Sequence, residues 1–386
     1  MASSARDAVI VEAVRAPVGK RNGALSGVHP ADLSALVLQA LAERSGIDPA
    51  LVDDVVWGCV SQVGEQTFDI ARTAVLSAGW PEHVPGTTVD RQCGSSQQAL
   101  HFAAAGVIAG HYDVAVAGGV EMMSRVPMGS SFAGGDGPIG TKYVERYPGV
   151  FPSQGIGAED IAATWGLSRA RLDEFSVASH EKAAAAIDEG RFTAQIAPIT
   201  LADGTVIDTD EGVRRGSTVE KLGTLKSAFK EDGVITAGNS SQISDGSAAL
   251  LVTTSDKAAE LGLTPLVRVH TAVVVGSAPM PMLTGPIPAT QKALAKSGLS
   301  IDEIGAFEVN EAFASVPLAW LAELGADEKA LNPNGGAIAL GHPLGGSGAR
   351  LFTTLVHHMR DNGIRYGLQT MCEGGGQANA TILELV

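Results

Sequence analysis

The chain has 386 residues, of which 45% are hydrophobic and 18% charged, and its 42 acidic and 27 basic side chains give a formal net charge of −15. This apolar content is enough to fill large cores, which excludes a wholly disordered chain. The acidic balance argues against non-specific binding to nucleic acid or to an anionic membrane, because both require a basic surface. At about 150 residues per domain, the length predicts two or three domains.

Three cysteines, Cys59, Cys93 and Cys372, lie far apart in the sequence. A sparse, odd set is typical of a reducing compartment rather than of a disulfide framework, and no Cys or His spacing suits a metal such as zinc. Residues 1–8 contain no apolar core of a secretory signal, and no apolar run approaches the length of about 18 residues that a membrane span requires. We therefore expect a cytoplasmic α/β enzyme without a bound metal ion.

The first part of the chain alternates apolar strand patterns with helical ones. Strands are predicted within residues 8–14, 52–62, 87–90 and 114–117, and helices over residues 31–44 and 95–108. The second helix is apolar on most faces, which predicts that it is buried. Strands that alternate with helices in this way predict a mostly parallel sheet covered on both faces.

The middle of the chain has a different character. Residues 121–157 are rich in Gly, Pro, Ser and Met and show little periodicity, which predicts a functional excursion rather than an ordinary loop. Residues 158–189 have a helical pattern, and Ser168 is a good N-cap for a second helix within it. Basic residues are concentrated in 213–230, where either a solvated charged helix or a site for a polyanionic ligand is consistent with the pattern.

The α/β pattern returns after residue 245. Strands are predicted at residues 248–253, 266–275, 306–309, 366–371 and 378–385, and helices at residues 291–296 and 348–358. The strand, turn and buried helix of residues 87–108 resemble the glycine-rich turn and helix of residues 332–358. This similarity suggests an internal duplication, although any two βαβ units share such a pattern.

Two cysteines and one histidine fall on turns at the ends of predicted strands. Cys93 precedes a helix, where the helix dipole and free N–H groups favour a thiolate; the alternative is an inert buried thiol. His342 is held between Gly341 and Pro343, which suits a fixed general base, or a histidine that only bonds a loop carbonyl. Cys372 opens a Cys-Glu-Gly-Gly-Gly turn whose N–H groups could stabilise an oxyanion, or which could be a simple glycine hinge.

Asn310 also follows a predicted strand, where its amide could hold a water or polarise a carbonyl, or could simply cap the next helix. Open α/β sheets bind their ligands at the carboxyl ends of strands, so these turns together form a candidate site. The chain contains no P-loop, and its first strand lacks the glycine-rich turn of a nicotinamide-binding domain.

Taken together, the four turns resemble those of the thiolase family. The segments are Val-Asp-Arg-Gln-Cys-Gly-Ser-Ser (89–96), Asn-Glu-Ala-Phe-Ala (310–314), Gly-Gly-Ala-Ile-Ala-Leu-Gly-His-Pro (335–343) and Cys-Glu-Gly-Gly-Gly (372–376). Their order and spacing match the family over essentially the whole chain. The resemblance implies an α/β thiolase fold, with two similar βαβαβαββ-type halves in a five-layer αβαβα core and an inserted loop domain. It also implies domains at 1–117 with 248–267, at 118–247 (the loop domain) and at 268–386.

The resemblance also implies a role for each motif residue. Cys93 would be the nucleophile that accepts the acyl group, and His342 would activate it. His342 and a water held by Asn310 would form one oxyanion hole, and the N–H groups of Cys93 and Gly374 would form the second. Cys372 would be the acid and base that acts on the methyl carbon of acetyl-CoA. In the loop domain, Arg214 would stack on the adenine of CoA and Ser241 would bond its pantetheine arm, so the basic stretch would serve a ligand.

The implied activity is that of an acyl-CoA:acetyl-CoA C-acyltransferase with a Cys acyl-enzyme and CoA as co-substrate, without a permanently bound cofactor. Asp90 and Gln97-Gln98 are more similar to actinobacterial thiolases of steroid degradation than to the short-chain biosynthetic enzymes. The alternatives are an acetoacetyl-CoA-forming biosynthetic thiolase, a carrier-protein condensing synthase, against which Cys372 argues, and a non-catalytic acyl-CoA or lipid carrier, against which both cysteines argue. The family further implies a homodimer or homotetramer.

Overall fold

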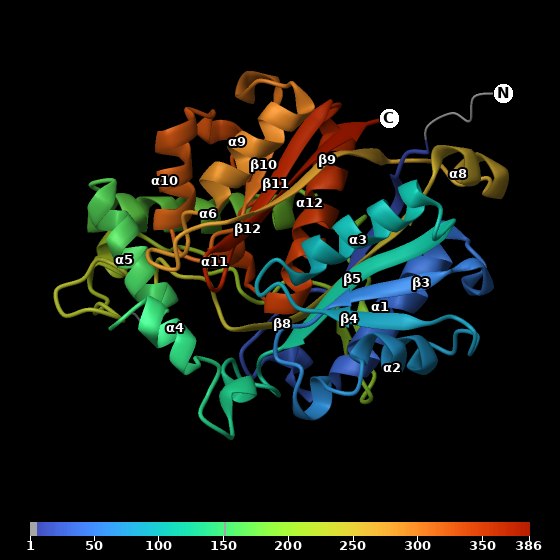
Figure 1. Ribbon diagram of the computed structural model, residues 1–386, viewed down its shortest axis with the longest axis horizontal. Helices are drawn as coiled ribbons and strands as arrows, with labels where there is room; N and C mark the ends of the chain where they lie inside the picture. The colour runs from blue at the N-terminus through green and yellow to red at the C-terminus, as the bar shows by residue number, and fades with distance from the viewer. Residues whose placement is uncertain (1–5, 150–151) are drawn as a thin grey trace.

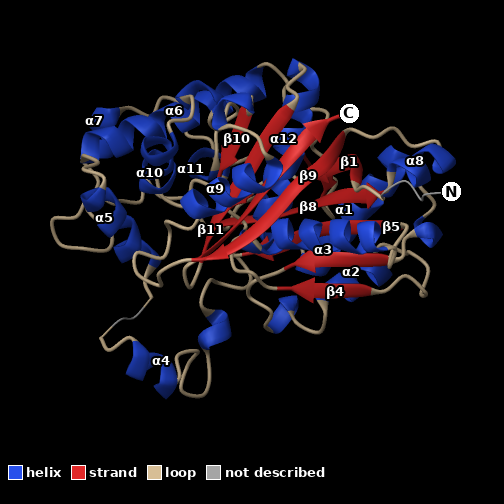
Figure 2. Cartoon of the chain, turned by 45° about the horizontal axis from the view of Figure 1, so that its top comes forward, coloured by secondary structure: helices blue, strands red, loops and turns tan. Residues whose placement is uncertain are grey.

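The structure, a computed structural model, describes residues 6–149 and 152–386. Its first sheet strands are β1 (Val9–Arg15), β2 (Gly19–Lys20), β3 (Asp54–Gly58), β4 (Gly86–Val89), β5 (Val114–Met122) and β8 (Ser244–Thr253). Those of the last third are β9 (Val267–Gly276), β10 (Ala306–Val309), β11 (Tyr366–Glu373) and β12 (Gln377–Leu385). They form one continuous sheet in the order β10-β11-β12-β9-β1-β8-β5-β3-β4, with β2 paired to β8 (Figure 2).

The two parts of this sheet repeat one topology. In the first, β8 runs antiparallel to β1 and β5, while β3 lies parallel to both β5 and β4. In the second, β12 runs antiparallel to β9 and β11, β10 lies parallel to β11, and a parallel bridge from Phe307 to Leu331 takes the place of β4. The parts meet where β1 pairs with β9. The expectation of two similar halves is therefore confirmed.

Helices cover this sheet in layers (Figures 1 and 2). They are α1 (Pro30–Ser45), α2 (Ile70–Ser77), α3 (Ser95–Ala109), α8 (Ser255–Leu261), α9 (Pro286–Ser297), α10 (Ser315–Leu324), α11 (Ala337–Leu340) and α12 (Ser347–Asn362). α1 and α2 pack on the outer face of the first half, and α9 packs on that of the second with α10 beside it. α3 and α12 contact each other, and α12 contacts strands of both halves. The result is the expected αβαβα order, with α3 and α12 in the middle layer.

Successive side chains of a strand join different cores, because they point to opposite faces of the sheet. In β3, Val55 and Trp57 join the core beneath α1 and α2, whereas Val56 joins the core around α3 and α12. In β5, Val114 and Val116 lie on the outer face, and alanines at the alternate positions face α3. Both faces of β5 and β8 are buried along their whole length, so these strands read as apolar runs, which is why they were predictable.

The segment between β5 and β8 contains one long helix, α6, and several short elements. They are α4 (Thr141–Arg146), α5 (Gln154–Thr164), α6 (Arg169–Asp188), α7 (Val219–Gly223), β6 (Ile199–Thr200) and β7 (Val206–Ile207). The predicted N-cap is present, because the Ser168 side chain accepts from the Arg171 N–H. Little of the basic stretch is helical, since only α7 forms there, which removes the charged-helix interpretation. The exact boundaries of the three domains stay a prediction.

A buried ion pair fastens this segment to the sheet. Both terminal nitrogens of Arg15, on β1, bind the Asp210 carboxylate at 2.7 and 2.8 Å, and neither side chain is exposed. Asp210 also accepts from the Val18 N–H at 2.8 Å.

In the described ranges, no helix combines the length and the apolar character that crossing a bilayer would take.

Candidate active site

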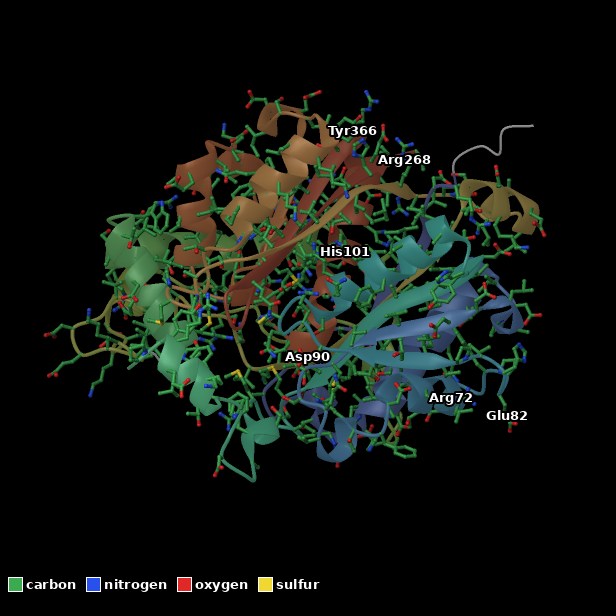
Figure 3. The ribbon with its side chains drawn as sticks, viewed as in Figure 1. Arg72, Glu82, Asp90, His101, Arg268 and Tyr366 are labelled. Atoms are coloured by element: carbon green, nitrogen blue, oxygen red, sulfur yellow. The ribbon has the colours of Figure 1, made fainter. Side chains whose placement is uncertain are left out.

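The Cys93 turn joins β4 to α3. Gln92 adopts a left-handed φ of 50°, and Ser95 stabilises this bend because its Oγ accepts from the Arg91 N–H at 2.9 Å and donates to the Gln92 carbonyl at 2.6 Å. The turn leaves Cys93 only 4% exposed, packed with Met123, Leu344, Leu351 and Met371. Asp90, labelled in Figure 3, lies on the same loop. The helix N-terminus predicted for Cys93 is therefore present.

His342 is fixed by the residues on either side of it. Gly341 has a φ of 100°, and a Cβ at that position would collide with Ser244 Oγ, which instead accepts from the His342 N–H at 3.1 Å. His342 Nδ1 lies 2.6 Å from Ser347 Oγ, whose own hydrogen is donated to the Pro343 carbonyl at 2.8 Å. Ser347 can therefore only accept from the ring, which assigns the proton to Nδ1 and leaves Nε2 unprotonated, with a lone pair that can act as a base.

The electrostatics favour the same neutral imidazole. Burial, with a smaller contribution from the charge of Arg350, lowers the pKa of His342 to about 3. The ring consequently carries no charge at physiological pH, which a proton acceptor requires.

Asn310 lies beside this ring. It follows β10 directly, its N–H donates to the Thr370 carbonyl at 3.1 Å, and its Nδ2 is 3.4 Å from His342 Nε2. The helix-cap alternative is wrong, because the next helix, α10, begins only at Ser315 with Ala314 as its N-cap. Asn310 Oδ1 is buried without a hydrogen-bond partner in the described part of the chain. That free acceptor is suited to a water or a substrate group.

Cys372 lies at the end of β11, next to the glycine turn. Gly375 and Gly376 have φ values of 82° and 78°, so this tight turn into β12 requires glycine. A Cβ at Gly374 would lie 2.9 Å from Gln92 Oε1, which shows how closely the two cysteine turns approach each other. In the described turns and loops, neither the Cys93 N–H nor the Gly374 N–H donates to a backbone carbonyl. Two free donors on adjacent turns can serve one oxyanion.

Burial changes the expected state of both thiols. Burial raises the pKa of Cys93 well above its usual value, and the nearby Cys372 and Glu373 raise it further. Burial and the charge of Glu373 raise the pKa of Cys372 to about 12. Desolvation therefore opposes the thiolate that a helix N-terminus favours, and burial keeps the proton on Cys93. Cys93 could act as a nucleophile only after a base had taken its proton.

Two buried glutamates that sequence reasoning missed hold these turns in place. Glu311 accepts from Ser179 Oγ, Asn332 Nδ2 and the Ile338 N–H, so it anchors the loop that leads to His342. Glu121, at the end of β5, accepts from the N–H groups of Val60, Ser61 and Gly345. Glu311 stands in the Asn-Glu-Ala-Phe motif, which was the one available signal, whereas nothing in the sequence marked Glu121.

Arg214 and Ser241 lie outside this cluster, on a separate pocket of about 540 Å³. Lys20, Arg21 and Gln242 also line it. The Ser241 N–H donates to the Ala312 carbonyl at 2.9 Å, so the pocket adjoins the Asn310 loop. Among the described residues, no group of three His, Cys, Asp or Glu side chains is placed to hold a metal ion.

Comparison with known proteins is consistent along the whole chain. The thiolase N-terminal domain family matches residues 8–256, and the thiolase C-terminal domain family matches residues 263–385. Two curated relatives are the steroid 3-ketoacyl-CoA thiolase of Mycobacterium tuberculosis, 49% identical with 98% of this chain and 94% of the relative covered, and the 3-ketoacyl-CoA thiolase of Bacillus subtilis, 42% identical with 98% and 100% covered. The crystal structure of the Bacillus anthracis acetyl-CoA acetyltransferase superposes with a TM-score of 0.92 at 38% identity over the full length of both chains. The chain has the thiolase fold and belongs to the thiolase family of acyltransferases.

Proposed function

We propose that this thiolase cleaves 3-ketoacyl-CoA esters with free CoA, by way of an acyl group carried on Cys93. The observation that carries the proposal is the approach of two buried cysteines from different halves of the sheet, so close that Cys372 raises the pKa of Cys93. The same chain holds His342 as a buried neutral ring whose Nδ1 is fixed by Ser347. A carrier protein without catalysis would have no use for this arrangement. An enzyme that used Cys93 alone would not need the second thiol, Cys372.

In the first half-reaction, Cys93 Sγ attacks the 3-keto carbon and its proton passes to His342 Nε2. The oxyanion that forms is stabilised by the free N–H groups described above. The bond between C2 and C3 then breaks, and the acetyl-CoA enolate takes the proton of Cys372. A thiol with a pKa raised to about 12 keeps its proton until such a strong base forms, so Cys372 is suited to this step.

In the second half-reaction, the Cys372 thiolate takes the thiol proton of free CoA, and the CoA sulfur attacks the acyl carbon. Cys93 leaves as a thiolate and recovers its proton from His342. The energy of the thioester is conserved throughout, because the acyl group passes from one sulfur to another. In the first half-reaction, Asn310 would hold a water that, together with His342, stabilises the oxyanion of the acetyl-CoA enolate.

The pocket that contains Arg214 and Ser241 is the proposed CoA site. Lys20, Arg21 and Arg214 place three cations on it, which suits the phosphates and adenine of CoA on an otherwise acidic protein. Arg214→Ala is expected to raise the KM for CoA about tenfold, in line with the loss of a charge-assisted contact, with a smaller effect on kcat. Arg215→Ala is the matched control, because Arg215 pairs with Asp188 at the surface and does not line the pocket. Equal effects of the two variants would contradict the assignment.

For the substrate, we propose a degradative role with a bulky, steroid-type 3-ketoacyl-CoA ester. The 49% identity to a steroid 3-ketoacyl-CoA thiolase supports this choice. Synthesis of acetoacetyl-CoA is the second candidate, favoured by the structural similarity to an acetyl-CoA acetyltransferase.

We further propose a cytoplasmic homodimer or homotetramer, which the exposed apolar side chains of Phe68, Met128 and Phe132 support.

The deciding experiment is thiolysis of a panel of esters, from acetoacetyl-CoA through long chains to a steroid-derived ester, with the acyl-enzyme followed by intact mass. We expect an adduct on Cys93 that CoA removes, absent in Cys93→Ser, and the highest kcat/KM with the bulky ester. A preference for acetoacetyl-CoA would favour the second candidate. Tight ester binding without any adduct would contradict thiolase chemistry.

A further inference from the structure

Glu373 is a buried carboxyl between the two cysteine turns, and the reaction steps above do not use it. It follows Cys372 directly and ends β11, opposite Gln377 in β12. Its side chain points at the other turn, because a Cβ on Gly94 would collide with Glu373 Oε1 and lie 2.7 Å from Asn379 Nδ2. Glu373 is thus adjacent to Cys372 along the chain and to the Cys93 turn through space.

Several polar atoms around this carboxyl are buried without hydrogen-bond partners in the described part of the chain. They are both carboxyl oxygens of Glu373, Asn379 Oδ1 and Arg91 Nε. The remaining polar groups of the same neighbours are engaged: Asn379 Nδ2 donates to the Gly94 carbonyl at 3.0 Å, and Arg91 Nη1 donates to Gln377 Oε1 at 3.0 Å. Unpaired groups at one buried spot are costly unless they satisfy one another.

A neutral carboxylic acid supplies what this cluster lacks. Its O–H is a donor for the unpartnered Asn379 Oδ1, whose side chain lies with Glu373 Oε1 beside Gly94. A carboxylate has no such donor and would leave Asn379 Oδ1 facing a negative charge. The hydrogen-bonding inventory therefore favours the protonated form.

We propose that Glu373 is a positioning residue that holds the two cysteine turns together while it is protonated, and that loss of its proton suppresses formation of both thiolates. The first part follows from the chain of contacts, since Asn379, which Glu373 would bind, holds the Gly94 carbonyl beside Cys93. The second follows from Coulomb's law, because a carboxylate here adds a negative charge next to two thiols that must ionise in turn. This inference rests on the proposed roles of Cys93 and Cys372.

The charges that face Glu373 agree with this assignment. Burial raises the pKa of Glu373 to about 8; the positive charge of Arg91 lowers it, and Asp90 on the same loop raises it. The titratable group next to Glu373 on β11 is Cys372, and the one on the facing turn is Cys93. Glu121, on β5, has a smaller effect, on Cys93. The carboxyl is therefore neutral at pH 7 and becomes ionised above about pH 8.

The test uses the full-length protein and three variants. Glu373→Gln keeps a donor and an acceptor but cannot ionise, whereas Glu373→Ala removes the polar side chain altogether. Glu384→Gln is the matched control, because Glu384 lies on the same strand pair at its far end, opposite Tyr366. Two quantities are followed from pH 6 to 10: kcat/KM for thiolysis of acetoacetyl-CoA, and the rate at which iodoacetamide alkylates Cys93, located by mass spectrometry.

If the inference holds, Glu373→Ala lowers kcat/KM at pH 7 at least tenfold, and Glu373→Gln recovers most of that loss. The wild type and Glu384→Gln lose activity above about pH 8, whereas Glu373→Gln does not. At pH 9, Cys93 of Glu373→Gln is alkylated about tenfold faster than in the wild type, the change that one pKa unit produces. The melting temperature of each variant shows whether the fold is kept.

Superimposable pH profiles of Glu373→Gln and the wild type would overturn the inference, as would an alanine variant as active as the glutamine variant. Failure of the proposed function has a different signature. In that case, wild-type Cys93 would form no acyl adduct with any ester at any pH, whatever residue stands at position 373.

Discussion

The two ring nitrogens of His342 have separate tasks, and Ser347 assigns them. Ser347→Ala removes the acceptor for the Nδ1 proton, so the ring can adopt the tautomer in which Nε2 carries the proton and cannot act as a base. We expect kcat to fall about a hundredfold, at the low end of what general base catalysis contributes, with a small change in KM. Steady-state kinetics at pH 7 measures this.

Ser347→Thr keeps the hydroxyl and is the control, so it should retain most of the activity that the alanine variant loses. An alanine variant with wild-type kcat would show that the tautomer is fixed by some other contact. Asn310 alone would then have to orient the ring.

At the scale of the element, short turns between secondary-structure elements place the side chains proposed for catalysis, and glycines allow these turns to pack closely. Gly341 is the clearest case, because it has a φ of 100° and no room for a Cβ beside Ser244. We expect Gly341→Ala to displace His342 and to lower kcat/KM at least a hundredfold. The backbone strain alone should cost about 1–3 kcal/mol of stability, measured by urea unfolding.

Gly363→Ala separates the strain from the loss of function. Gly363 ends α12 with a φ of 62°, and a Cβ there would meet no atom within 4 Å. This variant should lose about 1 kcal/mol of stability, as alanine in a left-handed conformation does, and keep its activity. If Gly341→Ala behaved in the same way, the position of the His342 loop would not depend on that contact.

The same turns show which parts of the fold and of the candidate site could be predicted from the sequence. The strands were predictable because most of the sheet is apolar and buried. Cys93, His342, Cys372 and Asn310 could be proposed from the sequence because each stands in a glycine-rich or motif-bearing turn. Glu121 was not, because its partners are backbone N–H groups from distant parts of the chain. The protonation of Cys93 could not be predicted either, since it depends on burial, which only the packed tertiary structure determines.

At the scale of the whole molecule, the layered core buries several histidines in their neutral form. Burial lowers the pKa of His101 and His342 to about 3, and that of His357 to about 4. In the unfolded chain these rings take up a proton near pH 6.5, whereas in the folded protein they do not. Their contribution to stability is therefore complete above pH 6.5 and is lost as the pH falls from 6.5 towards 3.

His101 offers the cleanest test of this acid sensitivity. It lies on α3, labelled in Figure 3, where its Nε2 is 2.7 Å from Thr381 Oγ1, away from the reacting groups. Between pH 7 and pH 5 a ring with such a low pKa costs about 2 kcal/mol. The free energy of unfolding in urea should therefore fall over this range in the wild type, and by about 2 kcal/mol less in His101→Gln, whose amide can still bond Thr381. Equal losses in the two proteins would mean that His101 is protonated in the folded state, and that the interface between α3 and β12 admits water.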